Sequence, residues 1–328
     1  LDFAIVGNIT DTGRMVLKSG ERIVGDLPVS PLVDDAPVYD RPYERSERPT
    51  SIASEQLIAD IAPLEALDIL LASPDLCAKR WIWEQYDHMV MADTILRPGG
   101  DAGVVRVHGS NKGLAITTDC TPRYCFAHPK SGGAQAVAET WRNLTAVGAR
   151  PLAITDCLNF GNPERPEVMG QFVGCIEGMA EACKVLDFPV ISGNVSFYNE
   201  TKGVSILPTP AIGGVGLIND IDRMTSIAFA APGERILLIG ETAGHLSTSI
   251  YARELKGRED GPPPQIDLAT EWRNGHFVRG LIQEGRVTAC HDVSDGGLLV
   301  AVAEMVLAAL DEGRAIGARI DLPDDGPP

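Results

Sequence analysis

Apolar residues recur at two spacings along the chain, and each spacing predicts a different element. Helical spacing runs from Pro63 to Ala72 and again over 76–90, 134–147, 167–186 and 268–284. Alternating or continuous apolar runs rich in β-branched residues predict strands over 100–107, 113–119, 151–160, 188–198, 210–218 and 235–241. Residues 287–310 have the pattern of a strand, a turn and a helix. Strands that alternate with helices indicate an α/β fold.

Two irregular segments divide this pattern. Residues 28–50 carry five prolines and many charges, which suits an extended linker, and 219–223 is a joint rich in Asp and Arg. We therefore expect a short first segment over 1–27, a linker over 28–62, one lobe over 63–219 and a second lobe over 220–328. The chain opens on Leu1 inside a strand-like alternation and closes on a strand-like run, so we expect a piece of a longer chain, truncated at both ends.

Composition and charge narrow the class of protein. The 328 residues are 44% hydrophobic and 22% charged, which is ordinary for a globular protein and allows a sizeable core. Lys and Arg total 28 against 45 Asp and Glu, and a net charge of -17 argues against a nucleic-acid partner. An anionic small molecule is still compatible, because backbone N–H groups and Mg²⁺ can hold a phosphate.

The cysteines and the hydropathy indicate the compartment. Seven cysteines are an odd number without a CxxC pair, so neither a disulfide framework nor a zinc site is predicted. No stretch approaches the roughly 18 apolar residues of a membrane span, and the N-terminus lacks a targeting pattern. We expect a cytoplasmic protein with no membrane contact.

Polar turns follow two of the predicted strands. They are TDCLNFGNPE over 155–164 and SGNVSFYNET over 192–201, and open α/β sheets bind ligands at such strand ends. Gly193 would allow close approach of a ligand, Asn194 offers an amide oxygen to a hard cation, and Ser196 offers a hydroxyl. An Asx-turn that satisfies only its own backbone is an equal alternative for the first segment, and a structural turn is the alternative for the second.

A third polar segment, CHDVSDGG, precedes the apolar helix predicted near the C-terminus. Asp292, Ser294 and Asp295 stand before Gly296, and a glycine-containing helix N-terminus presents free N–H groups to an anion. An N-cap role for Ser294 or Asp295 needs no ligand and explains the pattern at least as well. His291 is interpreted as a structural histidine.

Two further groups have strong structural interpretations. Lys112 could meet a phosphate and Asp119 could bind Mg²⁺, but 110–113 is also a good hairpin turn, which would leave Lys112 facing solvent. Three rings on the predicted helix 76–90 are interpreted as packing groups, namely Trp81, Trp83 and Tyr86.

Taken in chain order, the motifs resemble a known family. The series YDHMV, GGDAGVVRV, NKGLA, TTDC, GARPLAITDCLNFGNPE, VISGNVSFYNET, PTPAIGGVGLI and HDVSDGGLLVA closely resembles the second half of phosphoribosylformylglycinamidine synthase. The resemblance covers nearly the whole chain from about Pro28, and residues 1–27 look like the remnant of the preceding C-terminal-type lobe. It implies an aminoimidazole-ribonucleotide-synthetase-like unit of two lobes, the first with a mixed sheet and helices and the second α/β.

The resemblance also implies an activity and its partners. The family ligase converts formylglycinamide ribonucleotide, ATP and glutamine-derived ammonia to formylglycinamidine ribonucleotide, ADP and phosphate in purine biosynthesis, with Mg²⁺. The implied partners are the missing first half of the same chain, a glutaminase subunit and a small accessory subunit. Without the first half, a homodimer of this piece is a further expectation.

Matched residue by residue, the family pattern assigns four positions. It implies that Asp156 and Gly193 contact ATP, that Asn194 is a Mg²⁺ ligand and that Ser196 contacts the substrate. The family's catalytic histidine lies in a first-half motif whose counterpart here, ITTDCTPRY, has no histidine, so we expect no catalytic residue in this piece. The stretch HPKSGGA over 128–134 also departs from the family's DPYxGA-like pattern. The alternative is a non-catalytic half that binds a nucleotide or serves as a scaffold for the catalytic half and its partners.

Overall fold

The computed structural model describes residues 2–242 and 244–321, and the chain divides into two compact units, Leu1–Arg41 and Pro42–Pro328. The first unit contains an antiparallel hairpin of β1 (Arg14–Ser19) and β2 (Arg22–Pro28), followed by the short helix α1 (Ser30–Val33). Residues 2–10 lie outside any strand, although their pattern is strand-like, because extended backbone needs a paired neighbour to satisfy its N–H and C=O groups. The unit boundary falls inside the segment predicted as a linker.

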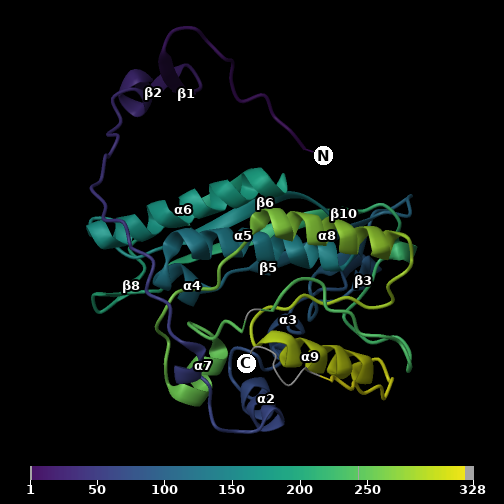
Figure 1. Cartoon of the computed structure of the whole chain (residues 1–328). Helices are drawn as coiled ribbons and strands as arrows, with labels where there is room; N and C mark the ends of the chain where they lie inside the picture. The colour runs from purple at the N-terminus through teal and green to yellow at the C-terminus, as the bar shows by residue number, and fades with distance from the viewer. Residues whose placement is uncertain (1, 243, 322–328) are drawn as a thin grey trace. The chain divides into compact units, whose positions relative to one another are not determined.

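A six-stranded sheet organises the second unit (Figure 1). Its strand order is β3 (Thr94–Leu96), β4 (Gly103–Arg106), β5 (Gly113–Asp119), β10 (Thr209–Ile218), β6 (Arg150–Asn159) and β7 (Val190–Ser196). Neighbouring strands are antiparallel except β6 and β7, which are parallel and joined through α6 (Pro166–Leu186). A helical crossover of this kind is what parallel neighbours require. Two short strands, β8 (Glu200–Thr201) and β9 (Val204–Ser205), form a separate hairpin.

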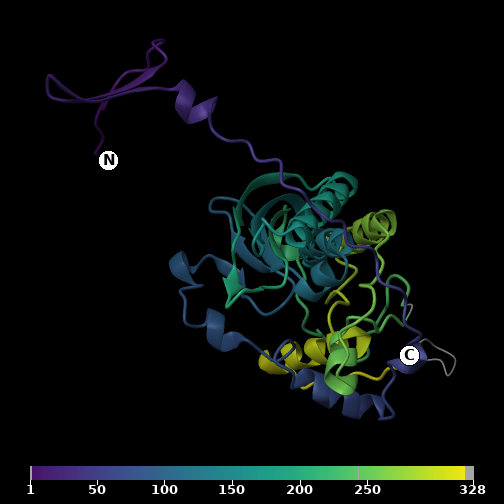
Figure 2. The ribbon, with the colours of Figure 1, turned by 90° about the vertical axis from the view of Figure 1, so that its left-hand side faces the viewer.

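Helices cover one face of this sheet. The long helices α5 (Pro129–Ala146) and α6 lie against it together with α4 (Pro122–Ala127), and α8 (Leu268–Gln283) packs outside them (Figure 2). Trp141 and Leu144 of α5 meet Ile154 and Ile212 of the strands in the main core. At Gly178 a Cβ atom would lie 1.9 Å from the carbonyl oxygen of Lys130, so α5 and α6 approach at backbone distance. The opposite sheet face is more open, and the Ile116 side chain there is 50% exposed.

The rest of the second unit is helical with long connections. Helix α2 (Pro63–Leu71) packs against α7 (Ile250–Lys256) and α9 (Gly297–Asp311) around Leu70, Ile250 and Val300. The remaining short elements are η1 (Ser54–Gln56), α3 (Arg80–Trp83), η2 (Val90–Ala92) and η3 (Ile221–Arg223).

Most predicted elements are confirmed to within five residues at either end, and three predicted elements, one helix and two strands, are wrong. The helix over 76–90 shortens to the single turn of α3, because Trp81 and Tyr86 are 68% and 73% exposed and supply no packing to stabilise a longer helix. The expected packing role of those two rings is therefore wrong. The strand predicted over 235–241 and the one that begins 287–310 are absent from the described ladders, since no neighbouring strand pairs with either segment.

Candidate functional site

The parallel pairing of β6 with β7 brings the four predicted site residues close together. Asp156 is directly opposite Gly193, Cys157 is opposite Asn194, and Asn159 is opposite Ser196. Both strands end at these positions, so the residues lie at the carboxyl end of one strand pair, on the edge of the sheet. This is the place where sheets of this kind bind ligands.

The same register divides the four residues between the two faces of the sheet. Because side chains alternate along a strand, Asp156 shares the helix-covered face with the buried Ile154 and Leu158, while Asn194 and Ser196 lie on the open face. A Cβ atom at Gly193 would lie 2.1 Å from Oδ1 of Asp156, so a larger residue here would require that carboxylate to rotate away. Burial raises the pKa of Asp156.

The turns after these strands are stabilised by their own side chains. Asn162 Oδ1 accepts a 2.9 Å hydrogen bond from the backbone N–H of Glu164, which is the predicted Asx-turn. Asn199 Nδ2 donates to the carbonyl oxygens of Phe160 and Ser196 at 3.0 and 2.9 Å. Asn194 differs from these two, because its exposed side chain has no hydrogen-bond partner among the described residues. Its amide is therefore free to bind a ligand.

A second polar cluster lies on the helix-covered face. Asp119 ends β5, and its carboxylate accepts hydrogen bonds from Asn143 Nδ2 at 2.8 Å and Thr117 Oγ1 at 3.1 Å. Arg142 joins this region to the C-terminal lobe through Glu271 at 2.7 Å and Asp292 at 2.9 Å. Ile212 pairs with both Asp119 and Asp156, so these two residues stand in one row across three strands. The usual spacing between neighbouring strands puts their backbones about 10 Å apart.

The carboxylates of this cluster are buried, and Arg142 offsets part of their charge. Burial raises the pKa of Asp119 to about 6, and burial together with the neighbouring Asp119 raises that of Glu139 to about 8. The Oδ1 atom of Asn143 is buried without a hydrogen-bond partner in the described part of the chain. An amide oxygen that is buried without a hydrogen bond lowers the stability of the fold, and few such atoms occur in native proteins. An oxygen of this kind beside carboxylates is a suitable ligand type for a divalent cation. We name Asp119, Glu139, Asn143 and Asp292 the acidic cluster.

The sequence pattern pointed to Asp119 and Asp292 in separate motifs but did not predict that they lie in the same region. It gave no role to Glu139. The available signal was the four-residue spacing of Glu139 and Asn143, which puts both on one face of a helix. The hairpin interpretation of 110–113 is confirmed, because β4 and β5 pair across it and Lys112 is exposed.

The segment before α9 is held by ion pairs. His291 Nδ1 lies 2.8 Å from Asp101 Oδ1, and its Nε2 lies 3.0 Å from Glu304 Oε2. Burial lowers the pKa of His291, but the two carboxylates outweigh this effect and raise it to about 10. Asp295 pairs with Arg123 at 3.4 Å, and Gly296 at φ 85° caps α9 without a side-chain bond. The N-cap interpretation of Ser294 and Asp295 is therefore wrong, whereas the structural role of His291 stays a prediction, with which its ion pairs are compatible.

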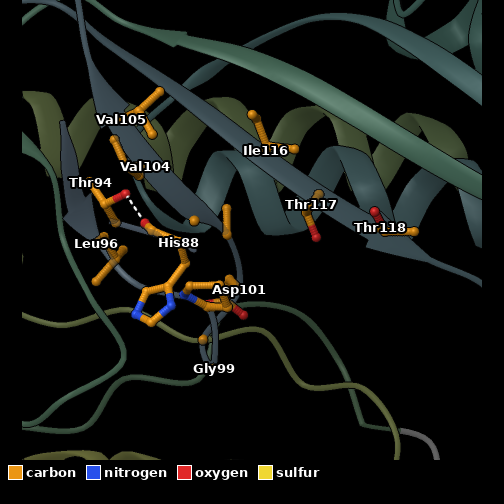
Figure 3. A pocket seen from close by; sticks show the side chains of 14 residues that line it. His88, Thr94, Leu96, Gly99, Asp101, Val104, Val105, Ile116, Thr117 and Thr118 are labelled. Atoms are coloured by element: carbon orange, nitrogen blue, oxygen red, sulfur yellow. Dashed lines mark hydrogen bonds between the residues drawn. The ribbon is translucent and has the colours of Figure 1, made fainter. Parts of the chain in front are cut away.

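A hollow of about 420 Å³ lies beside β4 and β5 (Figure 3). Asp101 and Gly99 line one end of it, and Thr117 and Thr118 lie along the strand at the other. The Oγ1 of Thr94 donates to the carbonyl oxygen of His88 at its rim. Asp101 thus connects this hollow to the ion pairs of His291.

Two family models match parts of this sequence. The N-terminal domain of AIR synthase related protein matches residues 99–218, and the C-terminal domain of the same family matches 231–327. The chain belongs to the AIR synthase related family, which confirms the predicted fold class. No helix in the described ranges is both long and apolar enough to cross a lipid bilayer.

The full-length relatives define the protein more closely. The chain is 59% identical over 326 residues to phosphoribosylformylglycinamidine synthase subunit PurL of Rhodopseudomonas palustris, and 60% identical over 320 residues to that of Bradyrhizobium. These matches cover 99% and 98% of this chain but 44% and 43% of the relatives, so the chain spans less than half of their length. The predicted resemblance to the synthase is confirmed, and the chain corresponds to part of a PurL subunit.

Solved structures agree with this assignment. PurLQS from Thermotoga maritima is 28% identical, with a TM-score of 0.51 over 66% of this chain and 33% of that one. T. maritima PurL complexed with AMPPCP has a TM-score of 0.60 over 96% of this chain and 45% of that one, and at 22% identity it supports the fold alone.

Proposed function

We propose that this chain is one part of the ATP-dependent ligase that converts formylglycinamide ribonucleotide, ATP and glutamine-derived ammonia to formylglycinamidine ribonucleotide, ADP and phosphate. The observation that carries the proposal is the β6–β7 register, which gathers Asp156, Gly193, Asn194 and Ser196 at one strand end. High identity to PurL subunits along nearly the whole chain supports it. Similar solved structures hold ATP or FGAR bound to PurL.

Each residue of this site has a role that its surroundings allow. Asp156 and Gly193 contact ATP, where the absent Cβ of Gly193 leaves space beside the carboxylate. The unpartnered amide of Asn194 supplies an oxygen to Mg²⁺, and Ser196 Oγ forms a hydrogen bond with the substrate on the same open face. Mg²⁺ in such a site offsets the charge of the transferring phosphoryl group. The catalytic residues come from the part of the PurL subunit that this chain lacks.

The proposed partners follow from the same assignment. They are the remaining half of the PurL subunit, a glutaminase subunit and a small accessory subunit, and one similar structure is of PurLQS. We place the complex in the cytoplasm and divide the chain at the predicted boundaries, with segments 1–27 and 28–62 and lobes 63–219 and 220–328.

The acidic cluster favours a second candidate function, a non-catalytic half that binds a nucleotide through Mg²⁺. Asp119, Glu139 and Asp292 offer carboxylates and Asn143 offers a buried, unpartnered oxygen, and these residues would have to move closer together to share one ion, because in the described part of the chain the ligand atoms within 4.8 Å of one another belong to Asp101, His291 and Asp292. In this role the chain's own residues hold the cation between the two lobes. None of these four residues lies within the divergent stretch from His128 to Ala134.

One experiment tests both functions. The purified chain is assayed for product formation by mass spectrometry, alone and with the separately produced N-terminal part of the R. palustris subunit. We expect no product alone and turnover only with both parts, and product from the isolated chain would contradict the proposal. Titration calorimetry with ATP and Mg²⁺ tests the second function, and Asp119→Asn should abolish Mg²⁺-dependent heat while the exposed Asp222→Asn should not.

A further inference from the structure

We propose that Asn159 is a further substrate-contact residue, which accepts a hydrogen bond from the substrate beside Ser196. The inference rests on the proposed ligase function and deepens it, because it concerns the same open face of the sheet. The ligand group that fits is one that both donates and accepts hydrogen bonds, such as an amide or a ribose hydroxyl of formylglycinamide ribonucleotide.

The strand register places Asn159 directly beside Ser196. Asn159 is the last residue of β6, and it pairs with Ser196 of β7 on one side and with Thr209 of β10 on the other. Paired residues of neighbouring strands point to the same face of a sheet, and neighbouring strands lie about 4.8 Å apart. One ligand group can therefore contact Asn159 and Ser196 together, and strands on both sides hold the backbone of Asn159 in place.

The amide of Asn159 is oriented through its nitrogen. Its Nδ2 donates to the carbonyl oxygen of Cys157 at 3.0 Å and lies 3.5 Å from Cys157 Sγ. An amide nitrogen carries two hydrogens, and these two contacts account for both. The Oδ1 atom has no hydrogen-bond partner among the residues that the structure describes. A ligand can therefore bind this oxygen without breaking a hydrogen bond within the chain.

The hydroxyl of Ser196 complements this oxygen. Its Oγ accepts from Asn199 Nδ2 at 3.2 Å, and its own hydrogen faces Asn199 Oδ1 at a longer distance of 3.4 Å. A ligand acceptor can replace this weaker contact. Ser196 then donates to the ligand while Asn159 accepts from it, and a group with both a donor and an acceptor satisfies the two together.

The neighbouring residue on β7 gives the bound substrate a direction. Asn194, the proposed Mg²⁺ ligand, precedes Ser196 by two residues, which is about 7 Å along a strand. The oxygens of an ionised phosphoryl group accept hydrogen bonds but do not donate them, so this group does not match Asn159 Oδ1. The arrangement therefore puts the phosphoryl group near Asn194 and an amide or hydroxyl of the substrate near Asn159.

The competing explanation is that Asn159 only supports the end of its own strand. Its hydrogen bond to the Cys157 carbonyl is local, and asparagine side chains often form such bonds. That role uses the nitrogen alone, so it predicts that loss of Asn159 lowers stability without changing the affinity for substrate. Substrate contact predicts a change in affinity.

The test measures steady-state kinetics of the full PurL subunit, with separate KM values for formylglycinamide ribonucleotide and ATP, beside the urea midpoint of each variant. Asn159→Ala should raise the KM for the ribonucleotide between about threefold and tenfold, the usual contribution of one hydrogen bond, and leave the KM for ATP unchanged. Asn159→Leu removes the acceptor with less loss of volume and should have the same effect. Asn219→Ala should change neither KM, because Asn219 is an exposed asparagine beyond the opposite end of β10.

A second measurement needs no variant. Cys157 precedes Asn159 by two residues on β6, so its exposed thiol lies on the same face. Formylglycinamide ribonucleotide should slow the labelling of Cys157 by N-ethylmaleimide, as mapped by mass spectrometry. Labelling of Cys77, which is also exposed, is the internal control and should not change.

The outcomes separate this inference from the proposed function. An unchanged KM in Asn159→Ala, while Ser196→Ala raises it, overturns the role of Asn159 alone. A wild-type subunit that forms no product overturns the proposed function. Asn162→Ala removes the Asx-turn of the same loop, and an equal rise in KM there would assign the effect to loop support and overturn the contact. Cys157 labelling that the ribonucleotide does not slow would also overturn it.

Discussion

Asp156 and Gly193 face each other across β6 and β7, and the carboxylate of the first occupies the space that a side chain of the second would need. The separation of 2.1 Å from an added Cβ to Oδ1 is too short for any real contact, so one group must move. This relationship makes a prediction for the isolated chain, without any ligand.

Gly193→Ala should force the Asp156 carboxylate to rotate away and destabilise the chain by at most about 1 kcal/mol, the low end of overpacking costs, as measured by urea denaturation. Asp156→Ala should remove most of that cost, because the clash needs both side chains, and the double-mutant cycle should show the coupling. Gly280→Ala in α8 is the control, since its Cβ would meet no atom within 4 Å and should not destabilise. Additive effects of the Gly193 and Asp156 substitutions would contradict the prediction.

Asn194→Ala should lower the activity of the full PurL subunit more than Asp119→Ala. Asn194 on β7 belongs to the proposed ATP and substrate site, whereas Asp119 lies three strands away on β5, in the acidic cluster. Charge alone suggests the reverse order, because a carboxylate is ordinarily the stronger Mg²⁺ ligand. Initial rates at saturating Mg²⁺ decide the order, with circular dichroism to show that both variants fold. A larger loss in Asp119→Ala would reverse the assignment of the two sites.

The start of α5 should be sensitive to acid. His128 Nδ1 accepts from the backbone N–H of Ser131, which requires a neutral ring, and burial together with Arg48 and Lys130 lowers the pKa of His128 from 6.5. The folded state therefore holds this proton less tightly than the unfolded state does. The stabilising contribution is present above pH 6.5 and is lost as pH falls through the lowered pKa.

Urea midpoints between about pH 7.5 and pH 5 measure this loss. His128→Asn keeps a capping oxygen that does not titrate in this range, so its midpoint should fall less than that of wild type. Parallel pH profiles for the two proteins would show that His128 does not act as a titrating cap.

The chain by itself should form a homodimer through the open face of its sheet. Exposed apolar side chains such as Ile116 mark such surfaces, and the charge of -17 opposes association only weakly when the Debye length is about 8 Å in 0.15 M salt. Sedimentation velocity should show concentration-dependent association that Ile116→Lys reduces. Leu237→Lys, at an exposed site in the C-terminal lobe, is the control. A monomer throughout the micromolar range would contradict this prediction.

The local sequence pattern was sufficient to predict two kinds of element: those with strongly periodic apolar positions, and those whose partners lie near in the sequence. The helices α5 and α6 and the strands that flank them follow from apolar spacing, and the pairing of β4 with β5 follows from the turn at 110–113. The failures have a different cause. The run over 235–241 has the composition of a strand, but a strand exists only with a paired neighbour, which composition does not reveal.

The candidate site was predictable in part for the same reason. Asn194 and Ser196 were predicted from a single sequence motif. Their position on the opposite face of the sheet from Asp156 depends on the register of β6 and β7, which the motif does not reveal. Asp101 and His291 are 190 positions apart, so only the folded chain brings their side chains together. Glu139 was overlooked because one acidic residue on a helix is usually a solvated surface group.

The pairing of β6 with β7, which runs one-to-one from Thr155 to Asn159 after an irregularity at Ile191, also constrains how the chain can change in length. Side chains alternate with a period of two, so a slip of one residue between these strands would exchange Asn194 with Gly193 across the sheet and place the amide among the helices. Insertions or deletions within 150–196 would have to preserve that pairing, whereas the long connections of the C-terminal lobe carry no such restriction. Length variation among related chains is therefore expected to concentrate after Ile218, and a survey of gap positions in relatives would show it.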